Sequence, residues 1–167
     1  AVIGVIPRRD LEEINWAVLW MGAGGFALGV ALNETGLAAN LINSIPFNTW
    51  PVLAVLIGSG VICYTLSNFI SNTATAALLV PILAVVGKSM TAELAPIGGV
   101  ACLLIGIAVA ASVAMILPIS TPPNALAHGT GMIEQKYMAK SGLIMGIIGL
   151  VLGYGMLVML GTIGFFG

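Results

Sequence analysis

The stretch SNFISNTATA, residues 67–76, interrupts the longest charge-free run of the chain, which covers residues 35–87. Its first seven residues include five uncharged polar side chains, namely Ser67, Asn68, Ser71, Asn72 and Thr73. Apolar residues flank this cluster on both sides, at 50–66 and 74–87. The cluster therefore divides the run into two apolar arms, and the lengths of those arms decide the fold.

The two arms contain 17 and 14 residues, which give helices of roughly 25 and 21 Å at 1.5 Å per residue. The first helix could just cross the hydrocarbon core of a bilayer, whereas the second is too short. These lengths predict a re-entrant helical hairpin over residues 50–87, with its tip at 67–73. The alternative is a pair of tilted spanning helices joined by an ordinary loop.

The composition predicts that lipid surrounds the chain. Hydrophobic residues make up 59% of it and charged residues 7%, and its mean hydropathy is +1.13, whereas about a quarter of an average soluble domain is charged. The charges leave uncharged runs at 14–33, 35–87, 94–133 and 141–167, each reaching the roughly 20 residues that a spanning helix needs. We therefore predict an all-α integral membrane protein, and a net charge of −1 suggests no nucleic-acid partner.

The apolar runs, and the polar or proline-rich interruptions between them, divide the rest of the chain into further segments. They are a linker at 1–13, a transmembrane helix at 14–33, an interfacial amphipathic helix at 34–46, a broken transmembrane helix at 95–138 and a transmembrane helix at 141–166. The broken helix is interrupted at 118–124, where three prolines each lack a backbone N–H and cannot continue a helix.

Basic residues predict the orientation. Arg8 and Arg9 precede the first crossing, and Lys88 follows the hairpin. The hairpin returns the chain to the side that it came from, so Lys88 is expected on the side opposite to Arg8. The broken helix then crosses back and brings Lys136 and Lys140 to the side of Arg8. The positive-inside rule places the larger basic group in the cytoplasm. We therefore expect a multi-pass protein of the plasma (inner) membrane, with the hairpin entering from outside and the linker in the cytoplasm.

Both breaks expose helix ends at membrane depth, where backbone groups survive only if protein or a watery cavity satisfies them. Half-helices that begin near Thr73 and Asn124 offer N–H donors and a positive dipole end, which suit an anion. Half-helices that end near Leu66 and Leu117 offer free carbonyls, which suit a hard cation such as sodium. Paired discontinuous helices hold substrate and coupling ion in many secondary transporters.

The absence of charge at these breaks bears on the coupling ion. A dianion bound there would find no Arg or Lys within the uncharged runs, and a buried unpaired charge is very costly. Cations must therefore accompany the anion. The same runs hold no Asp or Glu that could relay protons, so sodium coupling is favoured over proton coupling.

Two motifs carry a resemblance to a known family. SNTATAALLVP at 71–81, followed by AMILPISTPPNALAHGTG at 114–131, resembles the divalent anion:sodium symporter family, the INDY-type carriers of dicarboxylates, citrate and sulfate. Its members carry an SNT signature at the tip of a re-entrant hairpin in each of two inverted repeats. The resemblance implies half of an inverted-repeat transporter, the C-terminal part of the second repeat, with the N-terminal repeat missing and a homodimer in the full-length protein.

The resemblance also implies roles for individual residues. Contact with the substrate is implied for Ser71, Asn72, Thr73, Thr121 and Pro122. Contact with sodium, the transported ion, is implied for the side chains of Ser67 and Asn72 and for the carbonyls of Ile70 and Ser120. Asn124 would cap the half-helix that follows the second break.

Two residues depart from the family pattern. Asn68 replaces an acidic residue common in relatives, which leaves the hydrogen bonding around it open. Ile70 is bulkier than the small residue often found there, which matters little if only its carbonyl binds.

These observations predict sodium-coupled symport of divalent anions, foremost C4-dicarboxylates such as succinate, by alternating access, with this chain supplying half of the site. A sulfate or citrate carrier of the same family and a passive anion channel are the alternatives. The chain is not expected to be an enzyme. A serine protease built on Ser59 and His128 would need nucleophile and base within hydrogen-bond reach, which their spacing does not indicate, and His128 is interpreted as a packing or capping residue.

Overall fold

The computed structural model describes residues 49–166 without a gap, together with residues 16, 19, 20, 23, 24, 27, 30, 31, 34–37, 40, 44 and 46. The predicted linker at 1–13 lies wholly outside the described residues. The prediction for 14–33 falls mostly on residues outside them, and the prediction for 34–46 does so in part. The fold that positions the candidate site is built by residues 49–166.

Helices make up most of this part of the chain. In order they are α4 (Val52–Phe69), α5 (Asn72–Ser89), α6 (Thr91–Leu94), the 3-10 turn η2 (Ala95–Ile97), α7 (Gly99–Ser112), the 3-10 turn η3 (Pro118–Ser120), α8 (Pro122–Gly129) and α9 (Gln135–Thr162). Helices α4, α5 and α9 are each long and apolar enough to cross a membrane. Among the described residues there is no strand, and the prediction of an all-α membrane fold is confirmed.

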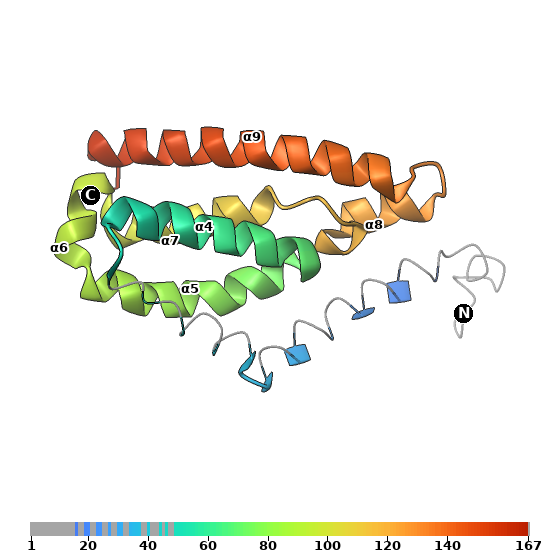
Figure 1. Cartoon of the computed structure of the whole chain (residues 1–167), viewed down its shortest axis with the longest axis horizontal. Coiled ribbons are helices and arrows are strands. Elements are labelled where there is room, and N and C mark those ends of the chain that lie inside the picture. Colours follow the sequence, from blue (N-terminus) through green and yellow to red (C-terminus); the bar gives the residue numbers. More distant parts are fainter. Residues whose placement is uncertain are drawn as a thin grey trace, which may run out of the picture.

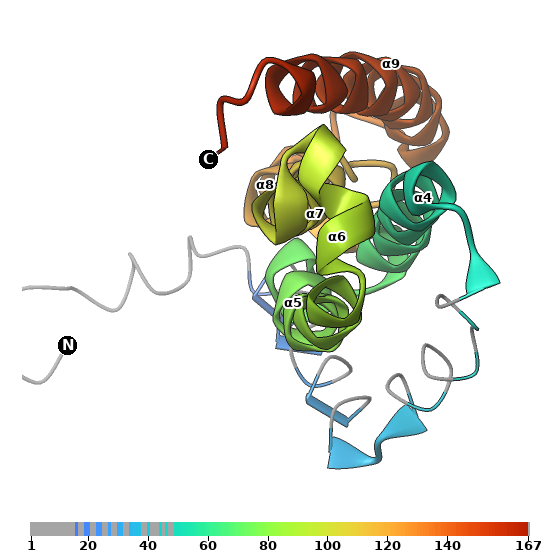
Figure 2. The ribbon, with the colours of Figure 1, turned by 90° about the vertical axis from the view of Figure 1, so that its left-hand side faces the viewer.

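Helix α7 lies at the centre of the bundle. Figure 1 shows α4 and α5 running antiparallel, and the end-on view in Figure 2 shows α4, α5 and α9 placed around α7. The α7 side chains of Cys102, Leu103 and Ile107 are fully buried against neighbours that include Leu56 of α4 and Leu83 of α5. Alanines and a glycine on the buried side of α7 let the surrounding helices approach closely.

The second arm of the hairpin is longer than the sequence suggested. Helix α5 contains 18 residues, not 14, because Asn72 and Thr73 form its first turn and Lys88 and Ser89 its last. At 1.5 Å per residue, α5 and the equally long α4 each span roughly 27 Å. The expectation that the second arm is too short to cross was therefore wrong. The lengths of the arms fit two spanning helices as well as a re-entrant hairpin, so they do not distinguish the two.

The broken helix also has different bounds from those expected. Helix α7 begins at Gly99, because the segment 91–97 is bent from it by 70°, with Gly98 and Gly99 at φ values of 98° and 69° that favour glycine. It ends at Ser112, so the break begins at Val113 rather than at residue 118. Helix α9 begins at Gln135 rather than at residue 141.

Two tyrosines fit against glycines where α9 meets its neighbours. The Tyr154 ring of α9 lies over Gly60 of α4 and Gly106 of α7, and its hydroxyl donates to the Gly106 carbonyl at 2.8 Å. In the reverse sense, the Tyr64 ring of α4 lies over Gly146 of α9. A methyl group on Gly60 or Gly146 would overlap the facing tyrosine, so these glycines permit the contact between α4 and α9.

The Tyr154→Phe variant is expected to lower the thermal midpoint of the full-length protein in detergent only slightly. The Gly106 carbonyl stays within α7, where it keeps its helical acceptor role, so the loss is that of one hydrogen bond, about 1 kcal/mol. The Tyr154→Ala variant also empties a packed site and should cost about 3–5 kcal/mol. Equal losses for the two variants would contradict a role based mainly on the ring.

Candidate functional site

The tip between α4 and α5 is a two-residue turn. Helix α4 ends at Phe69 and α5 begins at Asn72, which leaves Ile70 and Ser71 between them. The Ile70 N–H donates to the Leu66 carbonyl at 2.9 Å and closes α4. The Ser71 hydroxyl accepts from the N–H of Ala74 at 3.2 Å and so caps α5. Ser67 and Asn68 therefore lie in the last turns of α4 rather than in a loop.

The second break runs from Val113 to the start of α8. Thr121 caps α8, since its hydroxyl accepts from the Asn124 N–H at 3.4 Å, and the next two residues are prolines at positions where no N–H is needed. The expectation that Asn124 is the cap was wrong. Asn124 lies three residues past the cap, and its side chain instead donates to the Met115 carbonyl at 3.1 Å.

Two asparagines of the hairpin bind the backbone of the second break. The Asn68 Oδ1 accepts from the Ile116 N–H at 2.8 Å, and the Asn72 Nδ2 donates to the Ala114 carbonyl at 3.4 Å. With the bond made by Asn124, three consecutive residues of the break have a backbone group bonded to an asparagine, an arrangement that we call the amide clamp. The clamp gives these non-helical backbone groups partners within the protein, as a break at membrane depth would require, and it joins the two motifs predicted to form the site.

A cleft of about 490 Å³ opens beside the first turn of α5, between α5 and α7. It is lined by Asn72, Thr73, Ala76, Ala77, Val80, Ala108, Ala111 and Ser112. The small side chains leave the α5 N-terminus accessible, and Thr73 is exposed. Of the predicted substrate residues, Asn72 and Thr73 line this cleft. Thr121 and Pro122 lie apart from its lining, at the start of α8, where both are at least partly exposed.

Besides Asn72 in the first turn of α5, the predicted sodium residues lie in the last turns of α4, the tip and η3, which packs against α4. Ser67 is fully buried, and Ile70 and Ser120 are 5% and 1% exposed. The Ser67 hydroxyl lies 4.0 Å from the Cys63 sulfur, a weak contact that leaves its oxygen available. Oxygen atoms of this kind, hydroxyl and carbonyl, are the ligands that hard cations prefer.

Two buried oxygens beside the tip have no hydrogen-bond partner among the described protein atoms, the Oδ1 of Asn72 and the Oγ1 of Thr75. Thr75 is 1% exposed and lies three residues after Asn72, on the same face of α5. An unpaired buried polar atom is costly, which points to a water or ligand there. Sequence reasoning missed Thr75, although its spacing from Asn72 was a signal that could have indicated it.

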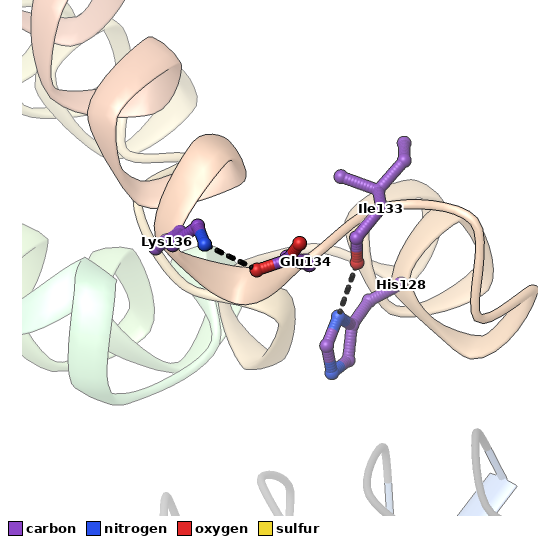
Figure 3. A network of polar contacts seen from close by, with 4 residues as sticks. All are labelled: His128, Ile133, Glu134 and Lys136. Atoms are coloured by element: carbon purple, nitrogen blue, oxygen red, sulfur yellow. Dashed lines mark hydrogen bonds and ion pairs between the residues drawn. The ribbon is translucent and has the colours of Figure 1, made fainter.

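His128 and Ser59 are each bonded to nearby backbone and not to each other. The His128 Nδ1 lies 3.3 Å from the Ile133 carbonyl and closes the turn that leads from α8 to α9 (Figure 3). In the same turn, the exposed Lys136 and Glu134 form an ion pair at 2.7 Å. The Ser59 hydroxyl donates to the Leu56 carbonyl within α4. The contact of His128 fits a capping role and gives no nucleophile–base pair.

Comparison with known proteins links this arrangement to transport. Residues 8–164 match the family described as the sodium:sulfate symporter transmembrane region. The chain is 37% identical over 148 residues to an uncharacterized transporter of Haemophilus influenzae, a match that covers 87% of this chain and 31% of the relative. It is 34% identical to Na(+)/dicarboxylate cotransporter 3 of Rattus norvegicus, with 87% of this chain and 23% of the relative covered.

A third relative is the sodium-dependent dicarboxylate transporter SdcS of Staphylococcus saprophyticus, 34% identical over 88% of this chain and 27% of the relative. The chain thus spans between 23% and 31% of the length of these three relatives. All three are named as transporters, in agreement with the prediction that the chain is not an enzyme.

Proposed function

Because the chain belongs to the divalent anion:sodium symporter family, we propose that it supplies half of the substrate and sodium site of a sodium-coupled transporter for C4-dicarboxylates such as succinate. The full-length protein would work by alternating access, as a homodimer, and the other half of the site would come from an N-terminal repeat. Two relatives are named as sodium-coupled dicarboxylate transporters, which supports this substrate class.

The observation that carries the proposal is the unpartnered Oδ1 of Asn72, buried at the capped start of α5 where the cleft opens. An amide oxygen without a donor is an available ligand for a cation. Sodium would be bound by this Asn72 oxygen, by the Ser67 hydroxyl and by the carbonyls of Ile70 and Ser120. The bound ion would place a positive charge beside the α5 N-terminus. That charge would offset the negative charge of a dicarboxylate where the chain offers no basic side chain.

The substrate would meet the starts of two helices. Ser71 uses its hydroxyl oxygen to cap α5 but keeps its O–H free to donate to a carboxylate, since a hydroxyl both donates and accepts. Thr73 adds a second hydroxyl at the cleft. Thr121 and Pro122, at the start of α8, would line the same substrate from the second break, where helix N–H groups and the dipole favour an anion.

The position of the tip supports a re-entrant hairpin. Figure 1 shows the tip beside the second break, short of the end at which α9 begins, and the Asn68–Ile116 and Asn72–Ala114 bonds join the two segments. A tip at the level of the break would lie inside the membrane. The ends of α5 and α9 that carry Lys88 and Lys136 lie at opposite ends of the bundle, in agreement with a hairpin that enters from outside and a cytoplasmic α8–α9 turn.

Uptake by the full-length protein in liposomes tests the proposal. Labelled succinate should accumulate when an inward sodium gradient is present and should only equilibrate without it. Sulfate, which the family description names, and citrate, the other alternative substrate, are compared with it. Equal succinate uptake without sodium would favour a passive anion channel, and preference for sulfate or citrate would correct the substrate. Residues 1–167 alone should not transport, and sodium-driven uptake by them would overturn the half-site.

A further inference from the structure

The Asn68 amide uses both of its ends within the protein. Its Oδ1 accepts from the Ile116 N–H at 2.8 Å, across the interface with the second break. Its Nδ2 donates to the Tyr64 carbonyl at 2.7 Å, within α4. The side chain is 4% exposed, and each end of the amide makes a hydrogen bond to the protein backbone. The two bonds fix the orientation of the amide, since each end finds the partner that it requires.

The position of Asn68 connects the two segments proposed to hold sodium. It follows Ser67 directly and comes two residues before Ile70, and the peptide that it binds lies four residues before Ser120. We propose that Asn68 is a positioning residue that holds the end of α4 against the second break, so that the sodium ligands contributed by the two segments keep their spacing. This inference rests on the proposed function. It gives Asn68 a role that needs no direct contact with sodium or substrate.

The Ile116 N–H explains why this position needs an acceptor. It lies in the break between α7 and η3, outside any helix, and Asn68 is 48 residues away in the chain. If the acceptor were removed, a partly buried N–H would lose its partner, which is unfavourable. The break could then shift relative to α4, and the carbonyl of Ser120 would move with it.

Two substitutions separate the bonds of Asn68. The Asn68→Asp variant keeps an oxygen acceptor for the Ile116 N–H in either protonation state. The Asn68→Ser variant is too short to reach the break, but its hydroxyl can donate to the Tyr64 carbonyl four residues earlier, as serines in helices commonly do. Ser59→Ala is the matched control, because it removes a buried hydroxyl whose hydrogen bond stays within α4.

Each variant of the full-length protein is measured in two ways. Amide hydrogen exchange of the segment 113–117 reports on the clamp itself and needs no transport. Sodium-dependent succinate uptake, normalised to folded protein, reports on the spacing of the ligands.

We expect Asn68→Ser to speed exchange in 113–117 and to raise the half-saturating sodium concentration about tenfold, the equivalent of about 1.4 kcal/mol. The half-saturating succinate concentration at saturating sodium should stay within about twofold, because Asn68 is not among the residues proposed to contact the substrate. Asn68→Asp and Ser59→Ala should resemble the parent protein in exchange.

The outcomes distinguish the inference from the proposed function. Parent uptake that does not depend on sodium would defeat the proposed function, while slow exchange in the parent and fast exchange in Asn68→Ser would still support the clamp. Sodium-dependent parent uptake with an unchanged sodium requirement in Asn68→Ser would overturn the positioning role. If Asn68→Asp does not fold, the positioning role is tested by comparing Asn68→Ser with Ser59→Ala in amide exchange of 113–117 and in the half-saturating sodium concentration.

Discussion

Sodium-driven succinate uptake by the full-length protein is expected to fall roughly ten- to hundredfold when Asn72 is replaced by alanine. The substitution removes the buried Oδ1 that has no partner among the described protein atoms and the bond from Nδ2 to the Ala114 carbonyl. An interaction between an amide and a charged group is worth about 1.5–3 kcal/mol, which corresponds to this range of rates. Initial uptake at several sodium concentrations measures the effect.

The control for Asn72→Ala is Thr65→Val in α4. The Thr65 hydroxyl donates to the Val61 carbonyl within the same helix and is exposed, so its loss should leave uptake unchanged. If Asn72→Ala transports as well as the parent protein at every sodium concentration, the polar tip is an ordinary packing turn. The proposed sodium site would then be wrong at its central residue.

Replacing Gly142 by alanine is expected to reduce uptake by more than about tenfold and to destabilise the fold. Gly142 lies in α9 against the backbone of Met115 and Ile116, where an added methyl group would overlap the Met115 carbonyl. Backbone atoms cannot rotate away as a side chain can, so α9 or the break must move. Overpacking of this kind costs about 1–3 kcal/mol, and the movement would disturb the amide clamp.

Gly155→Ala provides the matched control in the same helix, since an added methyl group there meets no atom within 4 Å. Both substitutions gain the helix propensity of alanine over glycine, about 1 kcal/mol, so the difference between them isolates the contact with the break. Thermal midpoints in detergent and uptake in liposomes measure that difference. If the two variants behave alike, the close approach of α9 to the break is unimportant.

Much of the architecture could be predicted from the order of residue types. The long uncharged runs indicate membrane helices, because charge is costly in lipid and backbone groups must bond within a helix there. The polar residues between two apolar arms placed a turn near Ile70, and the prolines at 118, 122 and 123 placed a break. These features are local, so the sequence is sufficient to locate them.

The limits of the helices were harder to predict, because capping depends on backbone geometry. Ser71 lengthens α5 by accepting from Ala74, and Thr121 rather than Asn124 caps α8. Both asparagine and threonine are good capping residues, so residue type alone could not choose between them. The early end of α7 at Ser112 precedes the first proline of the break, and the residues between give no local signal for it.

The order of residue types is enough to establish that this chain is a helical membrane protein with two polar interruptions, because hydrophobicity and helix-breaking act over a few neighbouring residues. How those interruptions meet depends on the tertiary packing. Asn68 and Asn72 bind backbone groups 48 and 42 residues away, and Gly142 of α9 lies against the same break. Such bonds depend on which helices pack together, and that packing is set by the whole core around α7 rather than by any single stretch of residues.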